Sequence, residues 1–149
     1  MINFKVDNLI ERRNDNPDLL AYRVHLDDKQ YVMYYDKDEL KEVYFVNRFK
    51  NYFMSCRSDM KTISHYYIDK TNPDNKVMRR YENGVHNRTY LMKTSRLITC
   101  TVDGQERIYT TTEETVTVDP QKFYSDLIFF LKKFNTLKLY ELFTPNEPI

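Results

Sequence analysis

The sequence predicts an α+β fold, with an antiparallel sheet of about five to seven strands and two main helices in one domain over 1–149. Three observations support this prediction. Asn83-Gly84 and Asp103-Gly104 separate segments of strand-like composition, and such pairs favour tight hairpin turns because both central residues need positive φ. Apolar residues alternate with polar ones in an N-terminal segment. Near the C-terminus they recur every three or four positions, which is the helical period.

The N-terminal part of the chain is expected to contain a hairpin. Leu20, Tyr22, Val24 and Leu26 fall on one face of an extended segment over 19–26, with polar residues on the other face. A short polar turn then leads to the partner strand "QYVMYY". The preceding segment "NLIERRND" is expected to form a short helix.

A first main helix is predicted over about residues 37–55. Asp36 and Glu39 have the spacing of a capping box, in which each side chain satisfies a free amide of the other. The β-branched residues of "VYFV" oppose a helix. The stripe that supports it consists of Leu40, Val43, Tyr44, Phe49 and Phe53.

The central part of the chain is expected to be a sheet. "KTISHYYI" has the composition of a strand and is followed by the turn-forming "DKTNPDN". A three-stranded antiparallel meander is predicted over 76–118, with the Asn-Gly and Asp-Gly pairs as its two turns. Its middle strand over 85–102 is either continuous or bent near 93–96.

The second main helix is predicted over about residues 120–143. Asp119 can cap the free amides of its first turn, and Pro120 suits the first helical position because no hydrogen bond is lost there. The apolar stripe expected to cover one face of the sheet consists of Phe123, Leu127, Phe130, Leu131 and Phe134.

Composition narrows the class of protein. The 41% of hydrophobic and 30% of charged residues are typical of a globular chain. No apolar run approaches the ~20 residues that span a bilayer, and charge follows the N-terminus too soon for a secretory signal. We therefore expect an intracellular protein, cytoplasmic or nuclear, without membrane association.

Cys56 and Cys100 fit buried apolar positions. The scarcity of Gly and Ala indicates an AT-rich genome, such as that of a virus or phage.

Positive charge is concentrated in one hairpin. Residues 76–102 hold 6 basic and 1 acidic side chains, although the net charge of the chain is only +1. A two-residue turn at Asn83-Gly84 would place Arg79 opposite Arg88, a like-charge pair that destabilises a sheet. Such a pair could form a fork for phosphate or carboxylate. Alternatively, the arginines are solvated, stack on tyrosines or pair with acidic residues elsewhere.

The candidate anion- or partner-binding residues share this hairpin. Tyr81, Tyr90 and His86 flank the arginine pair on the same predicted face and could stack on a ligand or hydrogen-bond to it. The complete candidate set is Arg79, Arg88, Tyr81, Tyr90, His86, Arg80 and Arg96.

Other chemistry finds no support in the sequence. The three histidines, His25, His65 and His86, do not have metal-ligand spacing. With both glycines in hairpin turns, a phosphate-binding loop and a dinucleotide fingerprint are excluded. We therefore expect no cofactor, no metal site and no catalytic residue.

Two functions fit these observations. The first is a non-enzymatic binding or regulatory protein, whose basic aromatic hairpin over 76–96 engages an acidic protein surface or single-stranded nucleic acid. Homo-oligomer formation stays open. The alternative is an enzyme acting on a phosphate or nucleotide substrate, with Arg79, Arg88, Arg96 and Arg107 lining a sheet cavity. A convex hairpin would favour the first function, and a pocket with converging arginines and carboxylates the second.

Overall fold

The computed structural model describes residues 3–46, 52–68, 75–83, 85–94, 98–102 and 105–137, with side chains over 3–46, 54–65, 80–83 and 110–136. Within these residues, twelve strands form one antiparallel sheet and are followed by one α-helix. The predicted antiparallel sheet is thus confirmed, with more strands than expected. The strands are β1 (Phe4–Val6), β2 (Leu9–Arg13), β3 (Leu19–Leu26), β4 (Lys29–Asp36), β5 (Glu39–Val46), β6 (Tyr52–Arg57), β7 (Thr62–Ile68), β8 (Asn75–Glu82), β9 (Val85–Thr94), β10 (Ile98–Val102), β11 (Gln105–Tyr109) and β12 (Thr111–Thr115).

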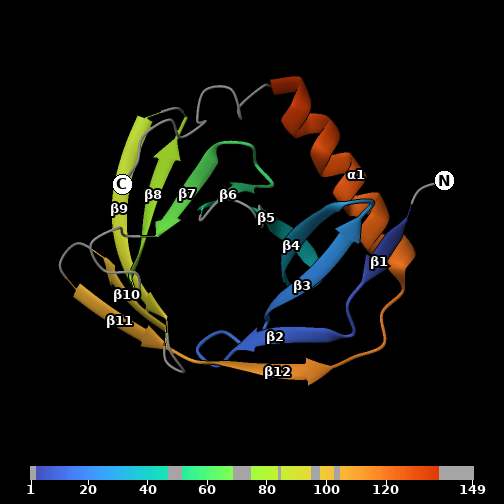
Figure 1. Ribbon diagram of the computed structural model, residues 1–149, viewed down its shortest axis with the longest axis horizontal. Helices are drawn as coiled ribbons and strands as arrows, with labels where there is room; N and C mark the ends of the chain where they lie inside the picture. Colours follow the sequence, from blue (N-terminus) through green and yellow to red (C-terminus); the bar gives the residue numbers. More distant parts are fainter. Residues whose placement is uncertain are drawn as a thin grey trace.

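The sheet closes into a ring, because the strands at its two ends are consecutive in the chain. Its order runs from β11 through β10, β9 and the preceding strands to β2 and then β12, while β1 pairs with β3. Only Thr110 separates β11 from β12. The backbone N–H of Asn14 donates to the Thr110 carbonyl at 2.9 Å. The sheet must therefore curl until its ends meet, as Figure 1 shows.

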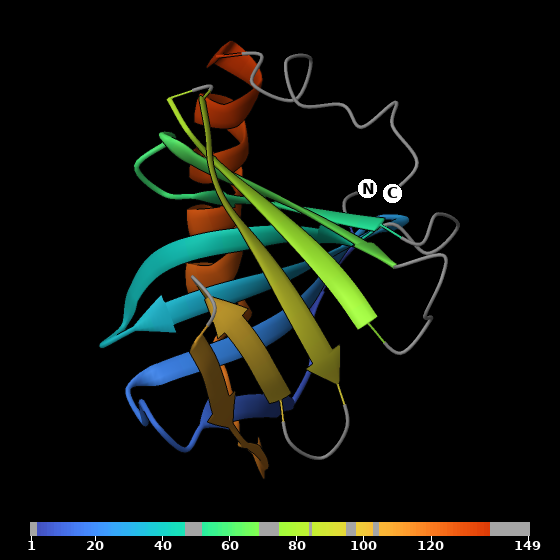
Figure 2. The same cartoon turned by 90° about the vertical axis from the view of Figure 1, so that its left-hand side faces the viewer.

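The helix α1 (Pro120–Leu137) lies on the outside of this ring, beside β1, β3 and β4 (Figure 1), and Figure 2 shows it running across the strands. As predicted, Asp119 caps it, since the backbone N–H of Gln121 donates to Asp119 Oδ1 at 3.0 Å. The predicted apolar stripe is confirmed on its buried face, where Phe123, Leu127, Phe130 and Phe134 are buried against the sheet and Leu131 is partly buried.

Strand β4 illustrates how the two faces of the sheet differ. Tyr31, Met33 and Tyr35 are buried in the core beneath α1, whereas the alternating Val32 and Tyr34 are half-buried on the opposite face. Side chains alternate between faces along a strand, and the helix is outside the ring. The face turned away from α1, here called the inner face, therefore lines the interior of the ring.

The predicted helix over 37–55 is wrong, because residues 39–46 and 52–57 are the strands β5 and β6. Lys37 and Asp38 have φ angles of 51° and 65°, and Asp36 pairs with Glu39. They form a two-residue hairpin turn with positive φ, which occupies the site of the expected helix start. The segment expected to form a short N-terminal helix is likewise β2.

The predicted meander over 76–118 is correct in its outer hairpins and wrong in its centre. Tyr81 pairs with His86, and Ile98 pairs with Tyr109, as the two turns require. The middle segment is not one strand, since β9 and β10 are themselves antiparallel partners. The end of the helix predicted to reach residue 143 lies outside the described residues.

Candidate functional site

A β-bulge changes the predicted pairing of the basic hairpin. The register of β8 and β9 shifts by one residue between Arg80 and Tyr81, so that Arg80, and not Arg79, occupies the position opposite Arg88. Arg79 pairs with Thr89 instead. Two arginine positions therefore do face each other across this hairpin, but they are those of Arg80 and Arg88, and the predicted opposition of Arg79 and Arg88 is wrong. A bulge places two residues of one strand against one residue of its partner.

The bulge also separates the candidate residues. Arg80 is half-buried, and its position pairs with Ser64 on β7. Tyr81 is half-buried on the other face, where its ring meets the edge of His65 with centroids 5.7 Å apart. The structure describes the register positions, but not the side chains, of Arg79, His86, Arg88 and Tyr90. Arg96 lies outside the described residues.

A row of polar residues crosses the inner face from β5 to β9. Directly opposed residues of antiparallel strands share a face. Along this row, Tyr44 pairs with Ser55, Ser55 with Ser64, Ser64 with Arg80, and Arg80 with Arg88. Ser55 and Ser64 are both fully buried. The sheet thus holds an arginine pair at one end of a buried hydroxyl row.

Glu42 joins this row from β5. The Ser55 hydroxyl donates to Glu42 Oε2 at 3.0 Å, and Tyr44 also hydrogen-bonds to the carboxylate. Burial raises the pKa of Glu42, while these two hydrogen bonds and the positive charges of Arg57 and Arg80 act in the opposite direction. The positive charge of Arg80 therefore lies close enough to Glu42 to favour its ionised form.

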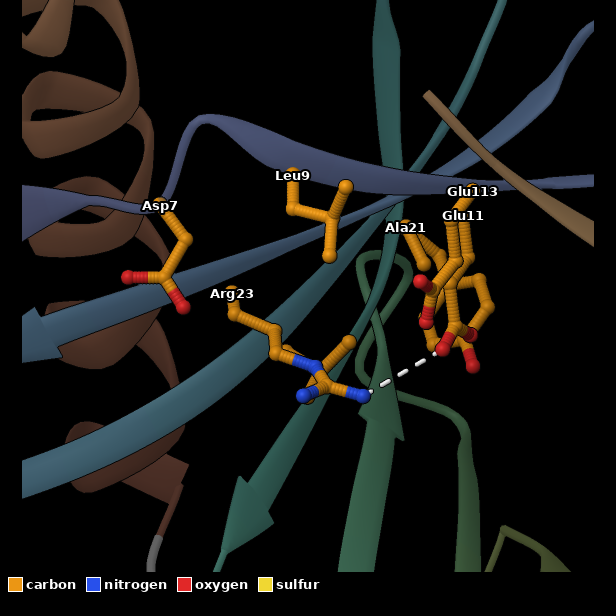
Figure 3. A pocket seen from close by; sticks show the side chains of 8 residues that line it. Asp7, Leu9, Glu11, Ala21, Arg23 and Glu113 are labelled. Carbon is orange, nitrogen blue, oxygen red and sulfur yellow. Dashed lines mark hydrogen bonds and ion pairs between the residues drawn. The ribbon is translucent and has the colours of Figure 1, made fainter. Parts of the chain in front are cut away.

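A pocket of about 180 Å³ opens on another part of the inner face (Figure 3). Its charged wall combines Glu11 of β2, Arg23 of β3 and Glu113 of β12. Arg23 Nη2 lies 3.2 Å from Glu11 Oε1, the contact marked by the dashed line in Figure 3. Its lining residues are Asp7, Leu9, Glu11, Ala21, Arg23, Val32, Tyr34 and Glu113.

Two carboxylates face each other in this pocket. Glu11 and Glu113 occupy directly opposed positions of β2 and β12, so closure of the ring brings them together. Glu114, the next residue, alternates to the outer face and forms an ion pair with Arg12 at 2.6 Å. Tyr34, which lines the pocket, also contacts the hydroxyl row, because its ring centroid is 4.9 Å from that of Tyr44.

The sequence interpretation missed Glu11, Arg23, Glu42, Ser64 and Glu113. Glu11 and Glu42 were assigned to helices, which hid their positions on strands. A strand interpretation of residues 39–46 would have put Glu42 and Tyr44 on the face opposite Val43, as their alternating burial indicates. The opposition of Glu11 and Glu113 depends on ring closure, for which no local sequence signal exists.

Among the described residues, no group of three potential ligands could hold a metal ion. Within the same part of the chain, no helix combines the length and the apolar character that crossing a bilayer requires. Comparison of the chain with family models, curated proteins and solved structures gives no match.

Proposed function

We propose that this protein binds a phosphorylated small molecule in the interior of the ring. The observation that carries the proposal is the opposition of Arg80 and Arg88 on the inner face, with the Arg80 side chain half-buried. Directly opposed like charges destabilise a sheet by about 0.2–1 kcal/mol. An anion between them relieves this repulsion, and guanidinium groups match phosphate oxygens in bidentate geometry.

The other residues of the inner face also favour the binding of a small polar ligand. Arg23 lines the pocket, and Tyr34 offers an aromatic wall between this pocket and Tyr44. Small-molecule sites are concave and carry a few polar groups that fix the orientation of the ligand. The combination of arginines and carboxylates on a concave face is the arrangement that the sequence interpretation associated with a phosphate or nucleotide substrate. The proposal concerns binding, since none of these residues is an evident nucleophile.

Engagement of an acidic protein or a single-stranded nucleic acid by the hairpin is less well supported. Such a partner needs the arginines and aromatic residues together on an exposed face. Arg80 instead belongs to the inner face, and Tyr81 packs on the opposite side against the buried His65. Arg79, whose register position is on the outer face, is the natural residue for distinguishing the two functions.

The test is to titrate tripolyphosphate and ATP into wild-type protein and into Arg80→Ala and Arg79→Ala by isothermal calorimetry. We expect Arg80→Ala to weaken binding about tenfold or more, because a charge-assisted hydrogen bond is worth roughly 1.5–3 kcal/mol. Arg79→Ala, the matched control from the same strand, should bind like wild type. Urea unfolding of each variant separates loss of binding from loss of folding.

The opposite outcomes have clear meanings. Absence of binding to wild type overturns the proposal. Equal loss in both variants, together with steep salt dependence for a single-stranded oligonucleotide, would favour nucleic-acid binding through the hairpin.

A further inference from the structure

The pocket between β2, β3, β4 and β12 carries negative charge that the described part of the protein does not neutralise. Glu11 and Glu113 are directly opposed on β2 and β12, so their carboxylates share one wall (Figure 3). Arg23 Nη2 lies 3.2 Å from Glu11 Oε1. Glu113, in contrast, has no hydrogen bond or ion pair with any described residue. One guanidinium therefore serves two carboxylates, and the charge of Glu113 is open to a further cation.

The next residue of β12 shows that acidic residues of this strand are not generally left in this way. Glu114 belongs to the outer face, and both of its carboxylate oxygens accept from Arg12, at 2.6 and 3.2 Å. Opposed like charges destabilise a sheet. The pairing of Glu11 with Glu113 therefore has a cost in the free protein, and a cation bound between the two carboxylates removes it.

The rest of the pocket offers apolar and aromatic surface. Ala21 is buried, Val32 is half-buried, and the ring of Tyr34 completes this wall. Leu9 is 46% exposed where it lines the pocket, so part of its apolar surface is uncovered. The volume of about 180 Å³ compares with the roughly 150 Å³ of a cavity that holds one benzene molecule. The pocket thus has room for a small organic group in contact with both the carboxylates and the apolar wall.

We propose that this pocket binds an organic ammonium, that is, a primary amine on a short hydrocarbon body. The ammonium donates hydrogen bonds to Glu11 and Glu113, since it has three donors and ionised carboxylates only accept. The hydrocarbon body packs against the apolar wall, where the face of the Tyr34 ring also attracts a cation. Among the described residues no group of three ligands suits a metal ion, which favours an ammonium over a metal.

This site is distinct from the proposed phosphate site. Arg80 lies on β8, and β5, β6 and β7 separate that strand from β4, the nearest strand of the pocket in the sheet order. The carboxylates of the pocket would repel a phosphate. Probes without phosphate therefore test the ammonium site independently of the tripolyphosphate titration.

The test compares butylammonium with 1-butanol, which share the hydrocarbon body and differ in charge. Each is titrated into isotope-labelled protein at low salt and followed by NMR. Butylammonium should bind saturably, shift the amide signals of Glu11 and Glu113, and bind about tenfold or more tightly than 1-butanol, because charge-assisted hydrogen bonds are lost with the alcohol.

Three variants locate the site. Glu113→Gln should weaken butylammonium binding about tenfold or more, because it removes the carboxylate that no other group neutralises. Glu114→Gln is the matched control from the outer face and should bind like wild type. Arg23→Gln removes the competing guanidinium and should therefore strengthen binding. Urea unfolding of each variant verifies that it is folded.

Three outcomes would overturn the ammonium site. The first is equal affinity of wild type for butylammonium and 1-butanol, and the second is an unchanged affinity in Glu113→Gln. The third is saturation of the same amide signals by Mg²⁺ at lower concentration than by butylammonium, which would identify a metal site instead.

Discussion

Tyr35 of β4 donates a hydrogen bond of 2.6 Å to Asp126 of α1, and this contact joins the ring to its helix. Tyr35 is buried, and both burial and the Asp126 carboxylate raise its pKa. Tyr35→Phe should destabilise the fold by about 1.5–3 kcal/mol, the range for a hydrogen bond to a charged group. Tyr124→Phe is the control, because the described contact of Tyr124 is through its ring, 5.2 Å from that of Phe4. Urea unfolding that gives equal stabilities for the two variants would contradict this assignment.

Truncation of two neighbouring phenylalanines of α1 should change the stability of the fold to very different extents. Phe130 is 2% exposed and Phe129 is 62% exposed. Phe130→Ala should cost about 3–5 kcal/mol because it leaves a cavity in the core. Phe129→Ala should be nearly neutral. Chemical denaturation of both variants measures the difference, and a neutral Phe130→Ala would show that this helix face is not part of the core.

The opposed carboxylates of the pocket should be destabilising when no ligand is bound. Glu113→Gln should therefore raise stability by about 0.2–1 kcal/mol, the cost of opposed like charges in a sheet. Glu11→Gln should raise stability less than Glu113→Gln does, because this substitution also removes the ion pair of Glu11 with Arg23. The gain in Glu113→Gln should shrink as salt screens the charges. A loss of stability in Glu113→Gln at low salt would contradict the repulsion.

His65 should make stability depend on pH. Burial lowers the pKa of His65 from 6.5 to about 4. Between these values the unfolded chain binds a proton that the folded chain does not, so stability is full above about pH 6.5 and falls toward pH 4. The pKa difference corresponds to roughly 3 kcal/mol.

Urea unfolding between pH 4 and 8 measures this dependence. His65→Gln should lose much of the slope below pH 6.5. His25→Gln is the control, because that ring lies near the surface and contacts Asp7 at 3.1 Å. If wild type and His65→Gln lose stability equally on acidification, the buried imidazole is not the cause.

The sequence predicted the C-terminal helix and the outer hairpins well because their signals are local. Asp119 and Pro120 mark a helix start, and the Asn-Gly pair marks a turn, with Asn83 at a φ of 50°. The error over 37–55 has an equally local cause. Its hairpin turn uses Lys37 and Asp38 without glycine, so the usual turn signal is absent and the capping-box spacing misled the interpretation.

The candidate site could be predicted only in part. Opposed arginines follow from the Asn-Gly turn, but one bulge exchanged Arg79 for Arg80 and thus moved the pair to the other face. A shift of one residue reverses the face of every later position in a strand. The arrangement of residues in the interior of the ring could not be predicted from the sequence. The pairing of Glu11 with Glu113 depends on two strands that lie far apart in the chain.

The pairing of β2 with β12 also governs how the chain can fold. Arg12 and Glu114, which meet across this pair, are 102 positions apart, so their contact closes a very long loop. Closing long loops costs chain entropy, and contacts of high sequence separation slow folding. The hairpins from β3 to β7 can form from local contacts while the chain is still being synthesised. Until β12 arrives, β2 presents an unpaired edge open to wrong partners. The ring interior is therefore complete only after this last strand has docked.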